Sequence, residues 1–180
     1  MHFKYDRSSQ EWEEALNNPA SKIHSETWMN DKTLDKWRHE RMLNKIKIYI
    51  DRKSTWLTVG DGRYGTDAHF IIKNGGDAHA SDISDTLLKI GNKKRYINSY
   101  SAQNAENLNF GDNSFDYVLI KEALHHCPRP WIALHEAFRV AKKAVILIEP
   151  SDNPSIFRSF KGFLKKIQGK RYNYGFEKIG

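Results

Sequence analysis

Three glycines constrain the fold of this chain more than any other sequence feature. Residues 56–65 read Trp-Leu-Thr-Val-Gly-Asp-Gly-Arg-Tyr-Gly, an apolar run that ends in Gly60, Gly62 and Gly65 at the spacing GxGxxG. Asp82 follows Gly60 by 22 positions, at the end of a second strand-like run. A strand, a glycine turn, a helix and an acid after the next strand form the pattern with which an α/β sheet holds an adenine nucleoside. The chain is therefore predicted to be an α/β protein with a nucleoside-binding loop.

Strand-like and helix-like segments alternate after residue 54. Strands are expected at Thr55–Val59, His79–Ile83, Tyr96–Tyr100, Phe115–Lys121 and Ala144–Glu149. Helices are expected at Asp67–Lys73, at Ser84–Ile90 with Gly91 as its cap, and at Trp131–Val140. Such alternation implies right-handed crossovers, so we predict a Rossmann-like, mostly parallel, doubly wound sheet. The apolar last strand fits a strand covered on both faces.

The two ends of the chain differ from this middle part. Residues 1–52 are predicted to form a helical N-terminal cap, with helices at 11–16 and Thr33–Ile50, and 53–180 the nucleoside-binding part of a single domain. Trp12, Trp28 and Trp37 are interpreted as core residues of the cap, and the alternative for Trp28, which lies in a polar stretch, is that it closes over a bound ligand. Residues 151–180 carry a net charge of +5, and an amphipathic helix is expected at 155–168 with its charges on the solvated face.

Composition excludes several classes of protein. The chain has 180 residues, 39% of them hydrophobic, and this length and hydrophobic content fit one folded domain. Its net charge is +7. It contains no run of 18 apolar residues, so no membrane span is predicted. One cysteine excludes an internal disulfide, and the N-terminus lacks the apolar core of a signal peptide. These features predict a cytoplasmic location.

Asp61 helps to choose the nucleoside. Its carboxylate, inside the glycine loop, would repel a pyrophosphate and would suit an ammonium or sulfonium cation. This favours S-adenosylmethionine over a dinucleotide. Arg63 lies in the same loop, so a nicotinamide-dependent oxidoreductase remains an alternative.

The segment after the third predicted strand carries a family resemblance. Ala105-Glu106, Ser114-Phe115-Asp116 and Leu124-His125-His126 resemble, in type and spacing, the class I S-adenosylmethionine-dependent methyltransferases. The small-molecule branch that includes the quinone-biosynthesis C-methyltransferases is the most similar. The resemblance covers about residues 55–150. It implies methyl transfer from S-adenosylmethionine to a small-molecule O, N or C nucleophile, leaving S-adenosylhomocysteine. Lys121-Glu122-Ala123-Leu124 does not match a nucleic-acid methyltransferase tetrad, so nucleic acid is not the expected acceptor.

The resemblance also implies a donor site. Its expected members are Gly60, Asp61, Gly62, Tyr64, Asp82, Ile83, Asn104, Ala105, Glu106 and Lys121. The loop glycines would line the methionine part, Asp82 would take the ribose hydroxyls, and Ile83 would pack on the adenine. Asn104, Ala105 and Glu106 would lie at the adenine edge, and the backbone carbonyl of Lys121 would face the methionine ammonium.

Two positions depart from the family pattern. Thr58 stands where the family usually has an acid, and Tyr64 where it usually has a glycine. Asp61 is the candidate substitute for the missing acid. The departures leave a second alternative open, a non-catalytic protein that binds S-adenosylmethionine.

His126 is the candidate catalytic residue, as a general base for the acceptor, because histidine titrates near neutral pH. Alignment of the reactants can also carry such a reaction without a base. The run His125-His126-Cys127 is not predicted to bind a metal, because adjacent side chains do not easily reach one ion and no matching ligand pair follows.

The sheet predicted here is shorter than the family's. The fold that the chain resembles has seven strands, whereas five are recognised, and the twelve residues after Gln168 are too few for two more. The last strand would then expose an apolar edge, which folded proteins normally cover. The expectation is that some 50–80 further residues of a longer protein finish the sheet, at usual element lengths. Alternatively, a partner chain such as a second copy covers this edge.

Overall fold

The computed structural model describes residues 17–18, 27–30 and 32–149. The chain divides into two units, 1–149 and 150–180, and the second lies wholly outside the described residues. The helices expected at 11–16 and 155–168 lie outside them as well.

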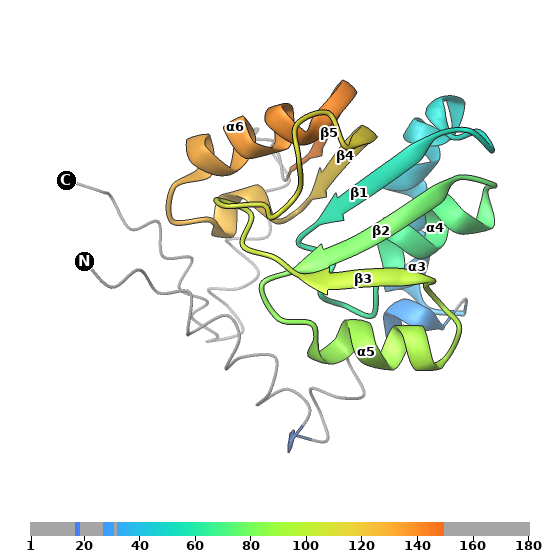
Figure 1. Cartoon of the computed structure of the whole chain (residues 1–180). Coiled ribbons are helices and arrows are strands. Elements are labelled where there is room, and N and C mark those ends of the chain that lie inside the picture. The colour runs from blue at the N-terminus through green and yellow to red at the C-terminus, as the bar shows by residue number, and fades with distance from the viewer. Residues whose placement is uncertain (1–16, 19–26, 31, 150–180) are drawn as a thin grey trace, which may run out of the picture. The chain divides into compact units, whose positions relative to one another are not determined.

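Five strands form one parallel sheet, as predicted (Figure 1). They are β1 (Thr55–Val59), β2 (Asp77–Asp82), β3 (Ser99–Ala102), β4 (Phe115–Lys121) and β5 (Ala141–Ile148). Their order is β3-β2-β1-β4-β5, and all neighbouring pairs are parallel. The winding direction reverses between β1 and β4. The carboxyl ends of these two strands therefore flank the switch point at which open α/β sheets bind ligands.

Helices cover both faces of the sheet (Figure 1). One face packs against α3 (Leu34–Leu43), the 3-10 helix η2 (Asn44–Tyr49), α4 (Thr66–Lys73) and α5 (Thr86–Lys93). The other packs against α6 (Pro130–Val140). Two short 3-10 helices, η1 (Thr27–Met29) and η3 (Leu124–His126), complete the described elements. Trp56 and Leu119 face the first helix layer, and Leu57 and Val118 face α6, so alternate strand residues fill two cores. No described helix has the length and apolar character needed to cross a bilayer.

The single helix predicted at Thr33–Ile50 changes type in its second half. α3 ends at Leu43 and the chain continues as the 3-10 helix η2, so the segment is helical to Tyr49 but is not one α-helix. Trp37 is also not a core residue, since 55% of its surface is exposed and its ring lies 5.4 Å from the Arg41 guanidinium. Trp12 and the side chain of Trp28 lie outside what the structure describes.

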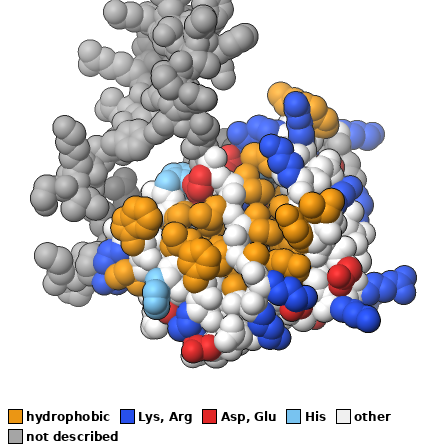
Figure 2. Space-filling view, turned by 90° about the horizontal axis from the view of Figure 1, so that it is seen from above, with side chains coloured by type: hydrophobic (Ala, Val, Ile, Leu, Met, Phe, Trp, Pro, Cys, Tyr) orange, Lys and Arg blue, Asp and Glu red, His pale blue; other side chains and the backbone are white. Residues whose placement is uncertain are grey.

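The prediction that the last strand is covered on both faces is wrong for the described part of the chain. β5 is the edge strand there, and Leu147 is 42% exposed. Trp131 and Phe138 of α6 are exposed as well. Figure 2 shows an apolar patch with lysines and arginines around it, on the side where α6 and β5 lie in Figure 1. The structure thus agrees with the expectation that the apolar edge is open in these residues.

Candidate functional site

The glycine loop connects β1 to α4 and is tied to the neighbouring strand. The backbone N–H groups of Gly60 and Asp61 both donate to the carbonyl of Ser81, at 2.9 and 3.0 Å. Gly60 has a φ of +78°, which L side chains rarely adopt. A Cβ at Gly60 would lie 2.2 Å from the Cβ of Ala123, so the loop after β4 touches the glycine loop here.

Asp61 is a structural cap of the following helix. Its carboxylate accepts hydrogen bonds from the backbone N–H groups of Asp67 and Ala68, in the first turn of α4, and from the Thr58 hydroxyl. Burial and the neighbouring Asp67 carboxylate raise the pKa of Asp61 well above its usual value. Both oxygens are therefore engaged within the loop and helix, and a contact of Asp61 with a bound donor stays a prediction.

Gly62 and Asp82 meet across the loop. A Cβ at Gly62 would lie 2.7 Å from the Cγ and Oδ2 of Asp82, so any other residue here would have to displace this carboxylate. Asp82 ends β2, is 7% exposed, and accepts the backbone N–H of Ser84 at 3.2 Å. Burial raises the pKa of Asp82 to about 6. The structure thus brings together two of the residues that the sequence singled out, and Ile83 follows them half-buried.

The position of Tyr64 explains why the predicted end of the second helix, at Gly91, is wrong. Its φ is +62° and its side chain is buried, with Lys94 Nζ 5.9 Å from the ring centroid. A Cβ at Gly91 would lie 2.3 Å from the Tyr64 carbonyl oxygen. Gly91 is therefore required inside α5 by the approach of the loop, and the prediction that it caps this helix is wrong. The left-handed position after α5 is taken by Arg95, with a φ of +57°.

The segment after β3 turns an acid inward. The Asn104 side-chain oxygen accepts the backbone N–H of Glu106 at 2.9 Å, which forms a tight turn. Glu106 is buried, and its two oxygens accept from the backbone N–H and the Nε of Arg129, each at 2.6 Å. Its carboxylate therefore fastens this turn to the start of α6, which no local pattern indicated. Ala105 between them is half-buried, and the roles of this segment toward an adenine ring stay predictions.

Replacing Arg129 with alanine is expected to lower the free energy of unfolding by about 1–2 kcal/mol, because one charge-assisted hydrogen bond to a buried carboxylate is lost while the guanidinium is half exposed. Urea denaturation measures the change, with Arg52→Ala as the control at an exposed cation. An Arg129→Ala protein with the urea midpoint of the wild type would show that the pair does not stabilise the fold.

Lys121 anchors a buried charge cluster beneath the loop. Its Nζ lies 3.3 Å from Oδ1 of Asp67 in α4 and donates to Nδ1 of His39 in α3, at 3.1 Å. Burial, with the Lys121 cation as the next cause, lowers the pKa of His39 to about 3, so the ring is neutral at pH 7. The side chain of Lys121 thus joins β4 to two helices. Only its backbone is left for the predicted contact with a donor ammonium.

The loop after β4 carries the histidines and a strained residue. Glu122 has a φ of +51°, an uncommon conformation for a side-chain-bearing residue and typical of functional sites. His126 is exposed, and its ring centroid lies 4.0 Å from that of His125. Burial, and then the carboxylates of Glu106, Glu149 and Asp82, raise the pKa of Cys127 to about 11, so the thiol stays protonated at neutral pH. No group of three or more His, Cys, Asp or Glu within the described ranges is arranged to hold a metal.

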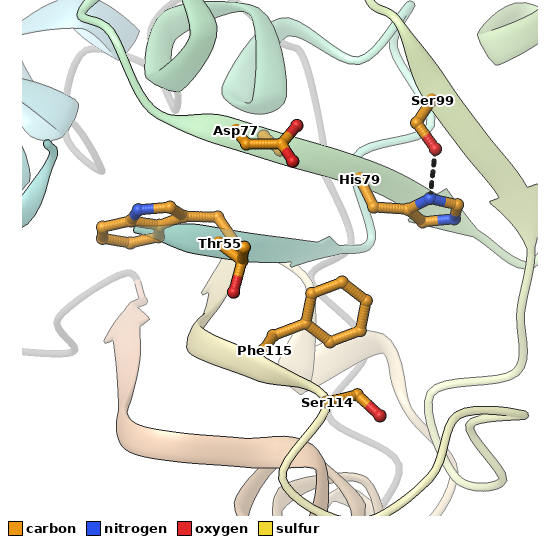
Figure 3. Close-up of a pocket in the computed structure, with 8 residues that line it drawn as sticks. Thr55, Asp77, His79, Ser99, Ser114 and Phe115 are labelled. Atoms are coloured by element: carbon orange, nitrogen blue, oxygen red, sulfur yellow. Dashed lines mark hydrogen bonds between the residues drawn. The ribbon is translucent and has the colours of Figure 1, made fainter. Parts of the chain in front are cut away.

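A cavity of about 210 Å³ lies at the opposite, amino-terminal edge of the sheet. It is lined by residues that begin β1, β2, β3 and β4, among them Thr55, His79 and Phe115. Figure 3 shows the His79 ring directed at Ser99, whose hydroxyl lies 2.6 Å from Nδ1. This cavity is separated from the glycine loop by the length of the strands and is not part of the predicted donor site.

Comparison with known proteins gives a consistent result. A demethylmenaquinone methyltransferase from Anoxybacillus flavithermus is 28% identical over 152 residues, which are 76% of this chain and 64% of that protein. The ubiquinone/menaquinone biosynthesis C-methyltransferase UbiE of Bartonella bacilliformis is 36% identical over 115 residues, covering 53% and 44%. The chain spans less than two thirds of the length of each relative. The crystal structure of the cyclase SpnF aligns with a TM-score of 0.57 at 23% identity, over 67% of this chain and 47% of that one, and shares the fold.

The comparison with protein families covers the site itself. The family described as a methyltransferase domain matches residues 57–148, which include the glycine loop, Asp82 and the loop after β4. This match takes in slightly more than half of the sequence, and both relatives named above are methyltransferases. The chain therefore belongs to the methyltransferase domain family.

Proposed function

We propose that this chain binds S-adenosylmethionine at the carboxyl ends of β1, β2, β3 and β4 and transfers its methyl group to a small-molecule O, N or C nucleophile. The observation that carries the proposal is the contact of Gly62 with Asp82, which sets a loop backbone against a buried carboxylate with no side chain between them. A carboxylate at the end of the second strand is the group that takes ribose hydroxyls in sheets of this class. Membership of the methyltransferase family supports the same function.

Each side of the donor would be held by a different strand end. Gly60 and Gly62 would line the methionine part, Asp82 would accept from the ribose hydroxyls, and Ile83 would pack on the adenine. The backbone of Ala105 and the amide of Asn104 would bind the adenine edge. When bound, the donor supplies an electrophilic methyl group on a sulfonium centre. The backbone carbonyl of Lys121 can accept a hydrogen bond from the methionine ammonium. The Lys121 side chain is not the proposed contact, because it is engaged with Asp67 and His39.

The acceptor would meet the donor beside the loop after β4. Rate enhancement then comes first from holding the nucleophile in line with the methyl group. His126 is exposed in this loop and is the candidate general base where the acceptor carries a proton. The names of the relatives make a demethylmenaquinone the first acceptor to assay. We place the protein in the cytoplasm. If no further strands of a longer protein cover the β5 edge, we propose that a second copy of the chain covers it.

A non-catalytic S-adenosylmethionine-binding protein is the second candidate. Thr58 and Tyr64 favour it, because both depart from the family pattern and Tyr64 is held buried at a positive φ. A nicotinamide-dependent oxidoreductase is the third, and the buried carboxylate of Asp61 inside the loop opposes a pyrophosphate there.

Calorimetric titration of the protein with S-adenosylmethionine and S-adenosylhomocysteine is expected to give dissociation constants in the low-to-middle micromolar range, roughly −7 to −8 kcal/mol. NADH is the control ligand and is expected not to bind. Binding of NADH alone would overturn the proposal. Transfer of a labelled methyl group to a demethylmenaquinone separates the enzyme from a protein that only binds the donor.

A further inference from the structure

Glu149, the residue after β5, reaches into the loop that follows β4. One carboxylate oxygen accepts the backbone N–H groups of Ala123 and Leu124, at 3.1 and 2.9 Å. The other oxygen lies 2.5 Å from Nδ1 of His125. The backbone reinforces the contact, because the N–H of Glu122 donates to the carbonyl of Ile148 at 2.7 Å. A single side chain therefore holds three consecutive residues of the loop.

This loop needs such support. Glu122 adopts a φ of +51°, which costs free energy that the surrounding contacts must offset. The next residue, Ala123, is the one whose Cβ would meet a Cβ at Gly60, so its position determines the space beside the glycine loop. The backbone N–H groups that Glu149 accepts begin the 3-10 helix η3, which carries His125 and His126. A shift of this segment would therefore change both the space beside the glycine loop, on the proposed donor side, and the positions of the histidines, on the proposed acceptor side.

We propose that Glu149 is a positioning residue for methyl transfer, which sets the Ala123–His126 segment against the glycine loop. The inference rests on the proposed function for its catalytic consequence and on the contacts themselves for its structural one. Glu149 acts through the loop, and a glutamine in its place retains an oxygen that can accept both backbone N–H groups. An alanine retains neither these hydrogen bonds nor the pair with His125.

The test compares Glu149→Ala and Glu149→Gln in the full chain. Asp116→Asn is the matched control, because Asp116 also accepts a backbone N–H, that of Thr55 at 3.0 Å, and also contacts a basic side chain, that of Lys143, but at the opposite edge of the sheet. Amide hydrogen exchange of a peptide covering residues 121–128 is measured together with the affinity for S-adenosylhomocysteine. In Glu149→Ala, exchange at Ala123 and Leu124 is expected to rise by about tenfold or more, as for amides released from a local hydrogen bond.

The affinity of Glu149→Ala for S-adenosylhomocysteine is expected to fall by about five- to fiftyfold, the effect of one or two lost hydrogen bonds on a site that they position. Glu149→Gln is expected to restore exchange protection and most of the affinity. Asp116→Asn is expected to be less stable than the wild type but to keep the exchange protection at Ala123 and Leu124 and the affinity for S-adenosylhomocysteine. If Glu149→Ala does not fold, Glu149→Asp, whose shorter side chain cannot span the three contacts, replaces it.

Two outcomes overturn the inference. One is an unchanged exchange rate at Ala123 and Leu124 without Glu149. The other is an equal loss of affinity in Glu149→Ala and Asp116→Asn, which would make the effect one of general stability. Failure of the wild type to bind S-adenosylhomocysteine overturns the proposed function instead. The exchange measurement then still decides whether Glu149 holds the loop.

Discussion

Replacing Gly60 with alanine is expected to lower the free energy of unfolding by about 2–5 kcal/mol and to abolish detectable donor binding. The left-handed φ of +78° costs an L residue about 1–2 kcal/mol. The added methyl group would lie 2.2 Å from the Cβ of Ala123, and forcing such an overlap apart typically costs about 1–3 kcal/mol. Because Glu149 holds Ala123, we expect the glycine loop to move, and the donor site with it. Urea denaturation and titration with S-adenosylhomocysteine measure the two effects.

Two control variants separate the causes. Gly75→Ala has a similar backbone problem, with a φ of +95°, but no atom within 4 Å of the new Cβ. Its free energy of unfolding is expected to fall only by the cost of an L residue at a positive φ, and its affinity for the donor is expected to equal that of the wild type. The double variant Gly60→Ala, Ala123→Gly removes the overlap and is expected to recover to the level of Gly75→Ala. No recovery in the double variant would contradict the contact between the two loops.

Asp82→Asn is expected to make the protein more stable at pH 7 while weakening donor binding by about 1.5–3 kcal/mol, the range for hydrogen bonds to a charged group. Burial raises the pKa of Asp82 from 3.8 to about 6 in the folded protein. The folded state therefore binds this proton more tightly than the unfolded chain does, and stability falls as pH rises from about 4 to 6. Above pH 6 the cost is complete, at about 3 kcal/mol. Asparagine has no such charge, so its stability advantage is largest at neutral pH and is lost below pH 4.

The same titration is expected to control donor binding in the wild type, because the proposed function places the ribose hydroxyls on Asp82. Protonation of Asp82 would turn an acceptor oxygen of the carboxylate into an O–H donor. The proposed ribose hydroxyls would then lose an acceptor, so donor affinity is expected to fall as pH drops through about 6. Thermal unfolding and calorimetry at pH 4, 5.5 and 7 follow both properties.

Asp116→Asn is the control of opposite sign. Hydrogen bonds from Thr55, and then Lys143, lower the pKa of Asp116, so its loss is expected to destabilise the protein at pH 7. An Asp82→Asn protein that is less stable at pH 7 than the wild type would refute the burial cost. Unchanged donor affinity would remove Asp82 from the donor site.

The order of elements could be predicted because it is encoded in local patterns. Apolar runs of strand length, glycines at a turn and helix-forming segments between them leave a parallel sheet as the solution, and the handedness of crossovers fixes its winding. The strand limits of Thr55–Val59 and Phe115–Lys121 agree with the structure to the residue. The strand at Tyr96–Tyr100 was placed too early, since β3 is Ser99–Ala102 and Ile97 instead packs against Gly65 below the loop.

What the sequence by itself determined is the α/β fold, the glycine loop and the acid that meets it, because these depend on spacing along one βαβ unit. Only the tertiary structure decided which polar and charged groups meet. Glu106 pairs with Arg129, 23 positions away, and Lys121 with His39, 82 positions away. Glu149 holds Ala123, 26 positions earlier. Such partners depend on which loops come together at the strand ends. They also depend on burial, because a buried charge needs a hydrogen-bonding partner or a counter-charge, and a local sequence pattern shows neither.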